Sequence, residues 1–230
     1  MLRSALGGDA NPLASLRVGN STTGRALRNR YLSAELQDEQ FGVRALDVGS
    51  LGYLETTIRR LRPKVILQIG SGLSTACLTR YMVELHGAKD TVYVYSIEPT
   101  GQSADLTTRR LAWLGLAANA RVLRLPLRQQ TVDGEPTTGF DLQSDALRQL
   151  LGNVKPDFVV VDGPSGEGEL RFGTIPLVRD FLESGASIFI DDALRDSELK
   201  TAATWSERRL VDVLGVCLVG KGLLVGKLAA

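Results

Sequence analysis

A glycine-rich turn is the first feature of the sequence that could bind a ligand. The turn 70–72 has the sequence Gly-Ser-Gly, follows the apolar segment 64–69 and precedes a segment of helix length. Glycines let the backbone turn tightly and approach a ligand, and the free N–H groups of a helix N-terminus favour a carboxylate or phosphate. The turn therefore predicts such a contact, with an ordinary turn capped by Ser74 or Thr75 as the alternative.

An acidic residue follows the next apolar segment at a spacing that suits a nucleoside. Glu98 ends the segment 91–97 and lies 26 positions after Gly72. A nucleoside on a glycine turn needs an acid at the end of the next strand, roughly 20 to 30 residues on, to bind its ribose hydroxyls. The pair predicts a nucleoside site, and a solvated acid at a strand end is the alternative.

Three carboxylates follow two later apolar segments. Asp162 ends the segment 157–162, and Asp191 and Asp192 end the segment 186–191. If those strands are neighbours, about 5 Å apart, the carboxylates converge at one edge of the sheet. Converging acids either repel and shift their pKa values or hold a hard cation such as Mg²⁺. The alternatives are a turn-capping role for Asp162 and a helix N-cap role for Asp192.

Two further features flank these carboxylates. The segment 163–169 is too rich in glycine to be a helix interior, and its position favours a mobile lid over a substrate, with a plain surface loop as the alternative. Arg171 and Arg195 could clamp an anionic substrate group or pair with nearby acidic residues.

Histidine and cysteine usage excludes several kinds of site. The chain has one histidine, His86, and two cysteines, Cys77 and Cys217. A zinc cluster of cysteines and histidines, a disulfide framework and a two-histidine metal site cannot be built from these residues. His86 precedes Gly87 at the end of a predicted helix, where a cation is favoured, and both cysteines are expected in the core.

The net charge of the chain does not favour any class of charged partner. The 230 residues include 27 Lys and Arg against 26 Asp and Glu, a net charge of +1, so neither nucleic acid nor an anionic membrane is expected to attract the chain. No apolar run reaches the roughly 18 to 20 residues of a membrane helix. Two thiols without an apolar secretion signal favour the cytoplasm. The basic first 34 residues vaguely suggest an organelle presequence, but a basic terminus before an early helix is commoner.

Apolar segments of strand length alternate with amphipathic segments of helix length. This order predicts an α/β fold of the Rossmann-like, doubly wound kind, because helices must cover both faces of a parallel sheet. A lead-in over 1–44, partly helical or flexible, precedes one domain over 45–230. The last two apolar segments are separated by Gly220 and Lys221, which predicts an antiparallel hairpin. The expected strands are 64–69, 91–97, 120–125, 157–162 and 186–191, and the expected helices are 75–86, 103–115, 142–151, 174–184 and 196–209.

The motifs QIGSGLST, SIEP, VVVDGPSG and FIDDALRDSE resemble those of class I S-adenosylmethionine-dependent methyltransferases, in a bacterial branch similar to O-methyltransferases. The resemblance covers about residues 45–228 and implies a seven-stranded, mostly parallel sheet that ends in an antiparallel hairpin. Gln68 stands where the family usually has an acid, and an amide cannot form a charge pair with the ammonium group of the cofactor. By this resemblance the cofactor residues are Gln68, Gly70, Ser71, Gly72, Ser74 and Thr75 for the methionine part, Glu98 for the ribose, and Pro126 and Leu127 for the adenine.

The three carboxylates resemble the metal site of catechol-type O-methyltransferases. Those enzymes hold their metal with an Asp after the fourth strand and an Asp-Asn pair after the fifth. The resemblance implies a divalent cation such as Mg²⁺ on Asp162, Asp191 and Asp192. Two departures weigh against it, because the pair here is Asp-Asp and Ser165 stands where those enzymes often carry a lysine.

The resemblance implies methyl transfer from S-adenosylmethionine to an oxygen, or less readily a nitrogen, of a small-molecule or carbohydrate acceptor. Asp162 or Asp192 is expected to deprotonate or orient the acceptor hydroxyl, and Arg195 to bind an anionic group. An aminopropyltransferase and a non-catalytic nucleoside-binding or scaffold protein remain alternatives. A nicotinamide dehydrogenase is disfavoured by the terminal hairpin and by the missing third glycine. Whether the protein is a homodimer stays open.

Overall fold

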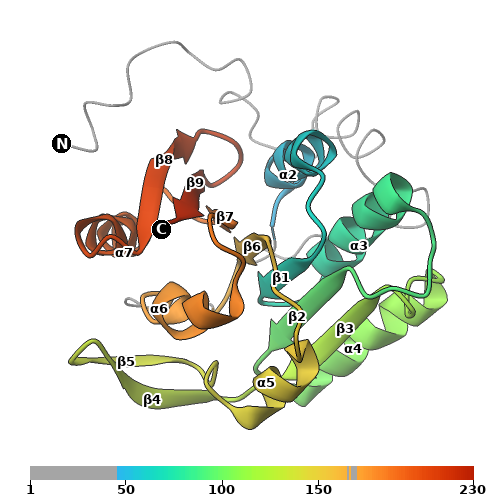
Figure 1. Ribbon diagram of the computed structural model, residues 1–230, viewed down its shortest axis with the longest axis horizontal. Coiled ribbons are helices and arrows are strands. Elements are labelled where there is room, and N and C mark those ends of the chain that lie inside the picture. Colours follow the sequence, from blue (N-terminus) through green and yellow to red (C-terminus); the bar gives the residue numbers. More distant parts are fainter. Residues whose placement is uncertain (1–45, 165, 167–169) are drawn as a thin grey trace.

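The computed structural model describes residues 46–164, 166 and 170–230, and its centre is one seven-stranded sheet (Figure 1). The strand order is β3-β2-β1-β6-β7-β9-β8, with five parallel strands and an antiparallel pair at one edge. The predicted sheet and its terminal hairpin are confirmed. The strands are β1 Ile66–Ile69, β2 Val94–Glu98, β3 Ala120–Arg124, β6 Phe158–Val161, β7 Ser187–Ile190, β8 Val211–Cys217 and β9 Leu223–Leu228.

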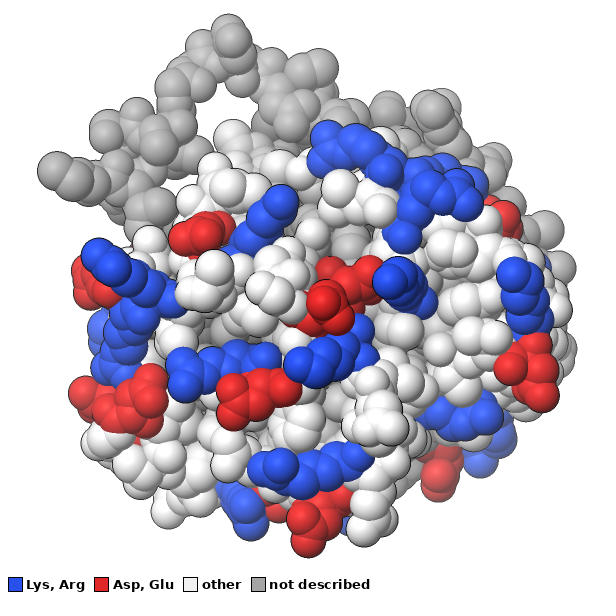
Figure 2. Space-filling model, in the orientation of Figure 1, with Lys and Arg blue, Asp and Glu red and all other residues white. Residues whose placement is uncertain are grey.

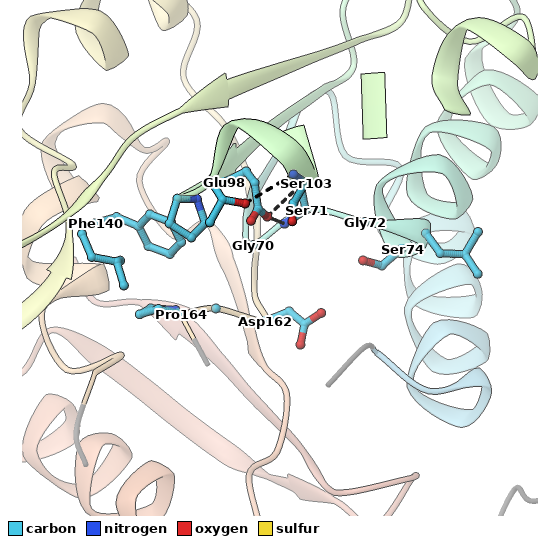
Figure 3. Close-up of a pocket in the computed structure, with 14 residues that line it drawn as sticks. Gly70, Ser71, Gly72, Ser74, Glu98, Ser103, Phe140, Asp162 and Pro164 are labelled. Atoms are coloured by element: carbon cyan, nitrogen blue, oxygen red, sulfur yellow. Dashed lines mark hydrogen bonds between the residues drawn. The ribbon is translucent and has the colours of Figure 1, made fainter. Parts of the chain in front are cut away.

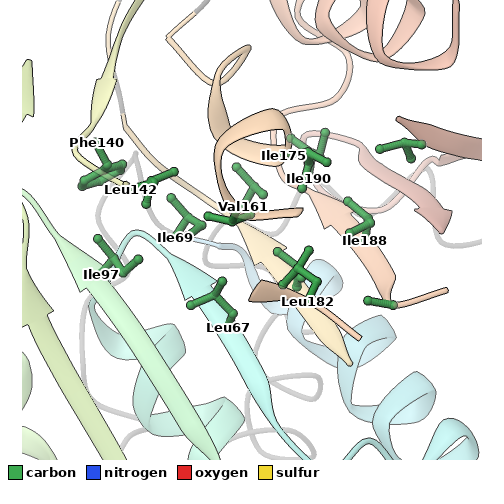
Figure 4. Close-up of a cluster of buried hydrophobic side chains, with 14 of the residues drawn as sticks. Leu67, Ile69, Ile97, Phe140, Leu142, Val161, Ile175, Leu182, Ile188 and Ile190 are labelled. Atoms are coloured by element: carbon green, nitrogen blue, oxygen red, sulfur yellow. The ribbon is translucent and has the colours of Figure 1, made fainter. Parts of the chain in front are cut away.

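The central strands are buried on both faces. All four residues of β1 and all four of β6 are buried. In β6, Val159 and Val161 face one apolar cluster (Figure 4), while Phe158 and Val160 face the other. Strands without a polar face need helices on both sides, which is why an apolar run such as FVVV predicts a central parallel strand.

The helices cover the two faces in two groups. The helices α2 Val48–Leu61, α3 Leu73–His86 and α4 Gly101–Trp113 pack on one apolar cluster. The helices α5 Asp145–Leu151, α6 Thr174–Val178 and α7 Asp196–Glu207 pack on the other, so the sheet is doubly wound. Three expected helices are shorter than predicted, namely 142–151, 174–184 and 196–209. The side chain of Ser144 caps α5 by accepting a hydrogen bond from the Leu147 N–H at 3.4 Å, and a 3-10 turn, Arg179–Phe181, follows α6.

A hairpin between β3 and α5 is an element that the sequence analysis missed. Its strands, β4 Leu127–Val132 and β5 Glu135–Phe140, form a separate two-stranded sheet near α6 (Figure 1). Asp133 and Gly134 make the turn with φ angles of 51° and 85°. An Asp-Gly pair with positive φ at both positions is the signal of a two-residue hairpin.

Several single residues lie where the sequence places them. His86 ends α3 before Gly87, whose φ is 90°, and its Nε2 lies 2.8 Å from the Pro63 carbonyl oxygen. Cys77 is buried, whereas Cys217 on β8 is only partly buried. The lead-in 1–44 and the presequence alternative lie outside the described residues.

Basic and acidic side chains are interspersed on the face shown in Figure 2, in keeping with the net charge of +1. Within the described ranges, every helix is too short or too polar to span a bilayer.

Candidate active site

A cavity of about 450 Å³ opens at the carboxyl ends of β1, β2 and β6, on both sides of the point where the strand order reverses (Figure 3). Open α/β sheets bind ligands at this point, and pockets for small molecules usually measure about 300–1,000 Å³. The cavity is lined by Gly70, Ser71, Gly72, Leu73, Ser74, Glu98, Pro99, Thr100, Ser103, Leu127, Phe140, Asp162, Gly163 and Pro164.

The glycine turn brings two strand ends into backbone contact. Gly70 has a φ of 98°, and a Cβ built there would lie 3.0 Å from the Gly163 nitrogen and 3.1 Å from the Asp162 carbonyl carbon. Only glycine fits this position, because the obstructing atoms are backbone. Gly72 is the N-cap residue of α3, and the Thr75 hydroxyl accepts a hydrogen bond from its N–H at 3.1 Å. The alternative in which Ser74 or Thr75 is the N-cap is therefore wrong.

Glu98 is tied to the glycine turn. Its Oε2 accepts hydrogen bonds from the Ser71 N–H at 3.1 Å and the Ser71 hydroxyl at 2.8 Å. The Ser71 Oγ also lies 3.2 Å from the Thr107 Oγ1 on α4. A carboxylate has about four acceptor positions, so two bonds leave capacity for a ligand. Glu98 is therefore both a brace for the turn and an acceptor at the cavity wall.

Gln68 and Thr75 lie under the turn rather than on the cavity wall. Gln68 is fully buried, and its Nε2 donates a hydrogen bond to the Ser74 hydroxyl at 2.8 Å. The hydroxyl of Ser96, which lies opposite Gln68 on β2, is 3.3 Å from the Thr75 Oγ1. Neither Gln68 nor Thr75 is among the cavity-lining residues, whereas Ser74 is. The structure thus makes Gln68 a support for Ser74.

The expected adenine side is formed in part by the hairpin. Leu127 lines the cavity together with Phe140, its cross-strand partner at the base of the hairpin. Pro126 is not among the lining residues. Local sequence patterns do not identify Phe140 as a cavity residue, because its place there depends on the β4–β5 pairing.

The three carboxylates lie at the carboxyl ends of β6 and β7, which are neighbours as predicted. Asp162 is 8% exposed, Asp191 fully buried and Asp192 2% exposed. Asp162 alone of the three lines the cavity, and Figure 3 shows it on a different side from Glu98. Its Oδ2 accepts a hydrogen bond from the Leu46 N–H at 3.3 Å, while its Oδ1 makes none to any described residue.

Basic side chains already neutralise Asp191 and Asp192. The Lys221 Nζ lies 3.1 Å from Asp191 Oδ2 and 2.6 Å from Asp192 Oδ1. Arg171 and Arg195 approach the other oxygen of Asp192, at 3.2 and 3.0 Å. The sequence analysis missed Lys221 because it treated the Gly-Lys-Gly segment only as a connection.

The two arginines differ in their availability to a substrate. Arg171 is 1% exposed and also donates to the backbone oxygens of Asp191 and Asp162, at 2.6 and 3.3 Å. It braces the two strand ends and is not free to clamp a ligand. The Arg195 side chain is exposed but is not among the cavity-lining residues. The backbone of Arg195 forms the N-cap of α7, so the alternative in which Asp192 is the N-cap is wrong. Most of the expected lid, 165 and 167–169, lies outside the described residues.

The carboxylate cluster does not fit a divalent metal. In the described part of the chain, no three acidic, histidine or cysteine side chains are arranged to hold one. Three of the four carboxylate oxygens of Asp191 and Asp192 already face ammonium or guanidinium groups, and the fourth accepts a hydrogen bond from the Ser50 hydroxyl. The sequence expectation of a metal on Asp162, Asp191 and Asp192 therefore finds no support in the geometry.

Burial and like charges perturb the acids of the cluster. Burial, with a smaller contribution from the neighbouring charge of Asp191, raises the pKa of Asp162 well above the usual range. Burial also raises the pKa of Asp191, although the nearby Lys221 opposes this. A strongly perturbed acid in a cavity wall is a candidate for proton transfer.

Comparisons with known proteins extend the description of the fold. No family model matches the sequence, and neither does any curated protein. Among solved structures, the chain is similar to a methyltransferase from Geobacter sulfurreducens, at 17% identity and a TM-score of 0.57, covering 92% of this chain and 91% of the other.

Two structures solved with S-adenosylhomocysteine or S-adenosylmethionine are similar to this chain to a comparable extent. The Bacillus cereus O-methyltransferase in complex with S-adenosylhomocysteine has 14% identity and a TM-score of 0.56, and the match covers 94% of each chain. The O-methyltransferase TomG of Streptomyces achromogenes, involved in tomaymycin synthesis and solved with S-adenosylmethionine, has 18% identity, a TM-score of 0.58 and the same coverage. At these identities the likeness establishes the fold, and the chain has the Rossmann-like fold of class I methyltransferases.

Proposed function

We propose that the protein is an S-adenosylmethionine-dependent methyltransferase that acts on the hydroxyl oxygen of a small-molecule or carbohydrate acceptor. The observation that carries the proposal is the pairing of Glu98 with Ser71 beside the Gly70 turn, at the switch point of this fold. The pairing places a carboxylate that would accept hydrogen bonds from a ribose next to Gly70, whose backbone conformation and close contacts favour glycine.

The residues around the cavity fit the parts of the cofactor. Glu98 would accept hydrogen bonds from the ribose hydroxyls, and the free N–H groups at the start of α3 suit the carboxylate of the methionine part. Ser74, held by Gln68, offers a hydroxyl on the same wall. Leu127 and Phe140 supply an apolar surface for the adenine.

When bound, S-adenosylmethionine would supply an activated methyl group for transfer to the acceptor oxygen, and S-adenosylhomocysteine would be the leaving group. Asp162, which lines the cavity, takes the hydroxyl proton that the acceptor gives up. Its Oδ1 is buried and makes no hydrogen bond to any described residue, so this oxygen keeps an acceptor position for the proton. The raised pKa of Asp162 suits this role, because it makes the carboxylate a stronger base than an ordinary aspartate. We assign the proton to Asp162 rather than Asp192, because Asp192 is paired with cations behind the cavity wall.

The alternatives are less well supported. Transfer of an aminopropyl group requires binding of a polyamine, yet the described cavity wall has two acids, Glu98 and Asp162, and one aromatic side chain, Phe140. Gln68, which stands where the family usually has an acid, is the feature that favours a non-catalytic scaffold. That argument weakens because Gln68 has a defined structural partner in Ser74.

Calorimetric titration with S-adenosylhomocysteine tests the cofactor, with NAD as the control nucleotide. Saturable 1:1 binding of S-adenosylhomocysteine and none of NAD would support the proposal, whereas no binding of S-adenosylhomocysteine would refute it. Transfer of a labelled methyl group is then measured with a panel of hydroxylated metabolites and sugars. An Asp162→Asn variant that binds cofactor normally and transfers at the wild-type rate would remove Asp162 from the mechanism.

A further inference from the structure

The inference concerns Lys221, which the sequence analysis treated only as part of a hairpin connection. Because β9 runs antiparallel to β7, with Ile190 opposite Leu224, the turn before β9 lies at the carboxyl end of β7. Two backbone hydrogen bonds pin it there: the Ala193 N–H donates to the Gly222 oxygen at 2.9 Å, and the Leu194 N–H donates to the Lys221 oxygen at 3.3 Å.

The turn has little freedom to take another shape. Gly220 has a φ of 52°, and a Cβ there would collide with the carboxylate of Asp47. Gly222 has a φ of 90°, and a Cβ there would lie 3.0 Å from the Leu194 nitrogen. The Lys221 N–H donates to Asp47 Oδ2 at 3.2 Å. Two obligatory glycines and a backbone hydrogen bond therefore fix the residue from which the ammonium group reaches Asp191 and Asp192.

The ammonium group lies within ion-pair distance of two buried carboxylates. Asp191 has Lys221 on one oxygen and the Ser50 hydroxyl at 3.4 Å on the other. Asp192 has Lys221 on one oxygen and the guanidinium groups of Arg171 and Arg195 on the other. A divalent ion could reach these carboxylates only by displacing Lys221, since hard cations require several free carboxylate oxygens.

We propose that Lys221 is a positioning residue whose ammonium group is the built-in cation of this cluster and excludes divalent metal ions from Asp191 and Asp192. Asp162 is the one carboxylate of the cluster that lines the described cavity. The exclusion of metal is a property of the cluster and is independent of the proposed function. Its catalytic consequence, methyl transfer that persists in excess chelator, rests on the proposed function.

Binding of Mn²⁺, followed by electron paramagnetic resonance, tests the inference without an activity assay. The wild type is expected to leave millimolar Mn²⁺ free in solution. Lys221→Met removes the charge and keeps most of the length, so the variant is expected to bind Mn²⁺ at least about tenfold more tightly than the wild type, because a like charge no longer opposes the ion. Lys221→Arg restores a cation and should again exclude the metal. Lys227→Met, on the exposed part of β9, is the matched control and should behave as the wild type.

The outcomes separate this inference from the proposed function. Stoichiometric Mn²⁺ binding by the wild type would overturn it, and this measurement needs no variant to fold. A folded Lys221→Met that gains no affinity for Mn²⁺ would overturn it as well. Titration of the same samples with S-adenosylhomocysteine shows independently whether the cofactor proposal holds.

Discussion

Removal of the Glu98 carboxylate is the sharpest test of the cofactor site. In the Glu98→Ala variant the Ser71 N–H and hydroxyl lose their common acceptor, which they reach at 3.1 and 2.8 Å. Ser71 borders the cavity, so water can replace part of what is lost. The ligand hydroxyls that the carboxylate would accept have no such replacement.

The expected loss can be estimated from the kind of bond. A hydrogen bond to a charged group contributes about 1.5–3 kcal/mol, so loss of the ribose contacts should weaken binding of S-adenosylhomocysteine by about 1–3 kcal/mol. This corresponds to an increase of about 5- to 150-fold in the dissociation constant. Glu98→Gln keeps one acceptor oxygen but loses the charge, and should lie between the wild type and Glu98→Ala.

Calorimetric titration with S-adenosylhomocysteine measures the change, and urea unfolding shows whether each variant is folded. Ser71→Ala is the matched control, because it removes the 2.8 Å bond to Glu98 and leaves the carboxylate in place. Unchanged affinity in a folded Glu98→Ala variant would refute the assignment. An equal loss in Ser71→Ala and Glu98→Ala would show that Glu98 acts by holding the turn rather than by contacting the ligand.

Three further predictions follow from backbone strain and burial. Because burial raises the pKa of Asp162, the methyl-transfer rate should rise with pH above the usual titration range of aspartate. The free energy of unfolding of the wild type, relative to that of Asp162→Asn, should fall over the same range, because the folded state holds the proton more tightly than the unfolded state. A rate that does not change with pH, and a difference in unfolding free energy that does not change either, would contradict this. Gly70→Ala should lower the free energy of unfolding by about 1–3 kcal/mol and abolish cofactor binding, because its φ is 98° and the added Cβ meets backbone atoms. Gly72→Ala is also strained, at a φ of 150°, but its added Cβ meets no atom within 4 Å, so it should cost less; urea unfolding compares the two variants. Burial raises the pKa of Cys77 to about 12, so a thiol reagent at pH 8 should label at most Cys217 in the folded protein, and rapid labelling of two thiols would contradict the structure.

Much of the fold could be predicted because its signals are local. Segments that are apolar on both faces, such as β6, indicate central parallel strands, and the glycines around Lys221 indicate the terminal hairpin. The β4–β5 hairpin was missed although Asp133-Gly134 carries its turn signal. Its strands are mostly polar and exposed, so they lack the alternation of apolar residues by which a strand is recognised.

The candidate site was predicted in outline and not in its contacts. The residue types and spacing of the Gly70 turn, Glu98 and Asp162 were sufficient to place all three at one edge of the sheet, because the carboxyl ends of parallel strands meet there. The sequence could not show that Gln68 supports Ser74, since a buried amide chooses its partner from what the packed turn offers.

The sequence by itself determined the order of the helices and of the strands of the main sheet, and the chemistry available at each strand end, because these depend on residues close together in the chain. Only the tertiary structure decided which charges meet. Lys221 reaches Asp191 and Asp192 because β9 pairs with β7 in one register, and Arg171 is buried against the same strand ends. These ion pairs join residues 20 to 30 positions apart, which local sequence patterns do not encode. Asp162 is the one carboxylate of the cluster that lines the described cavity.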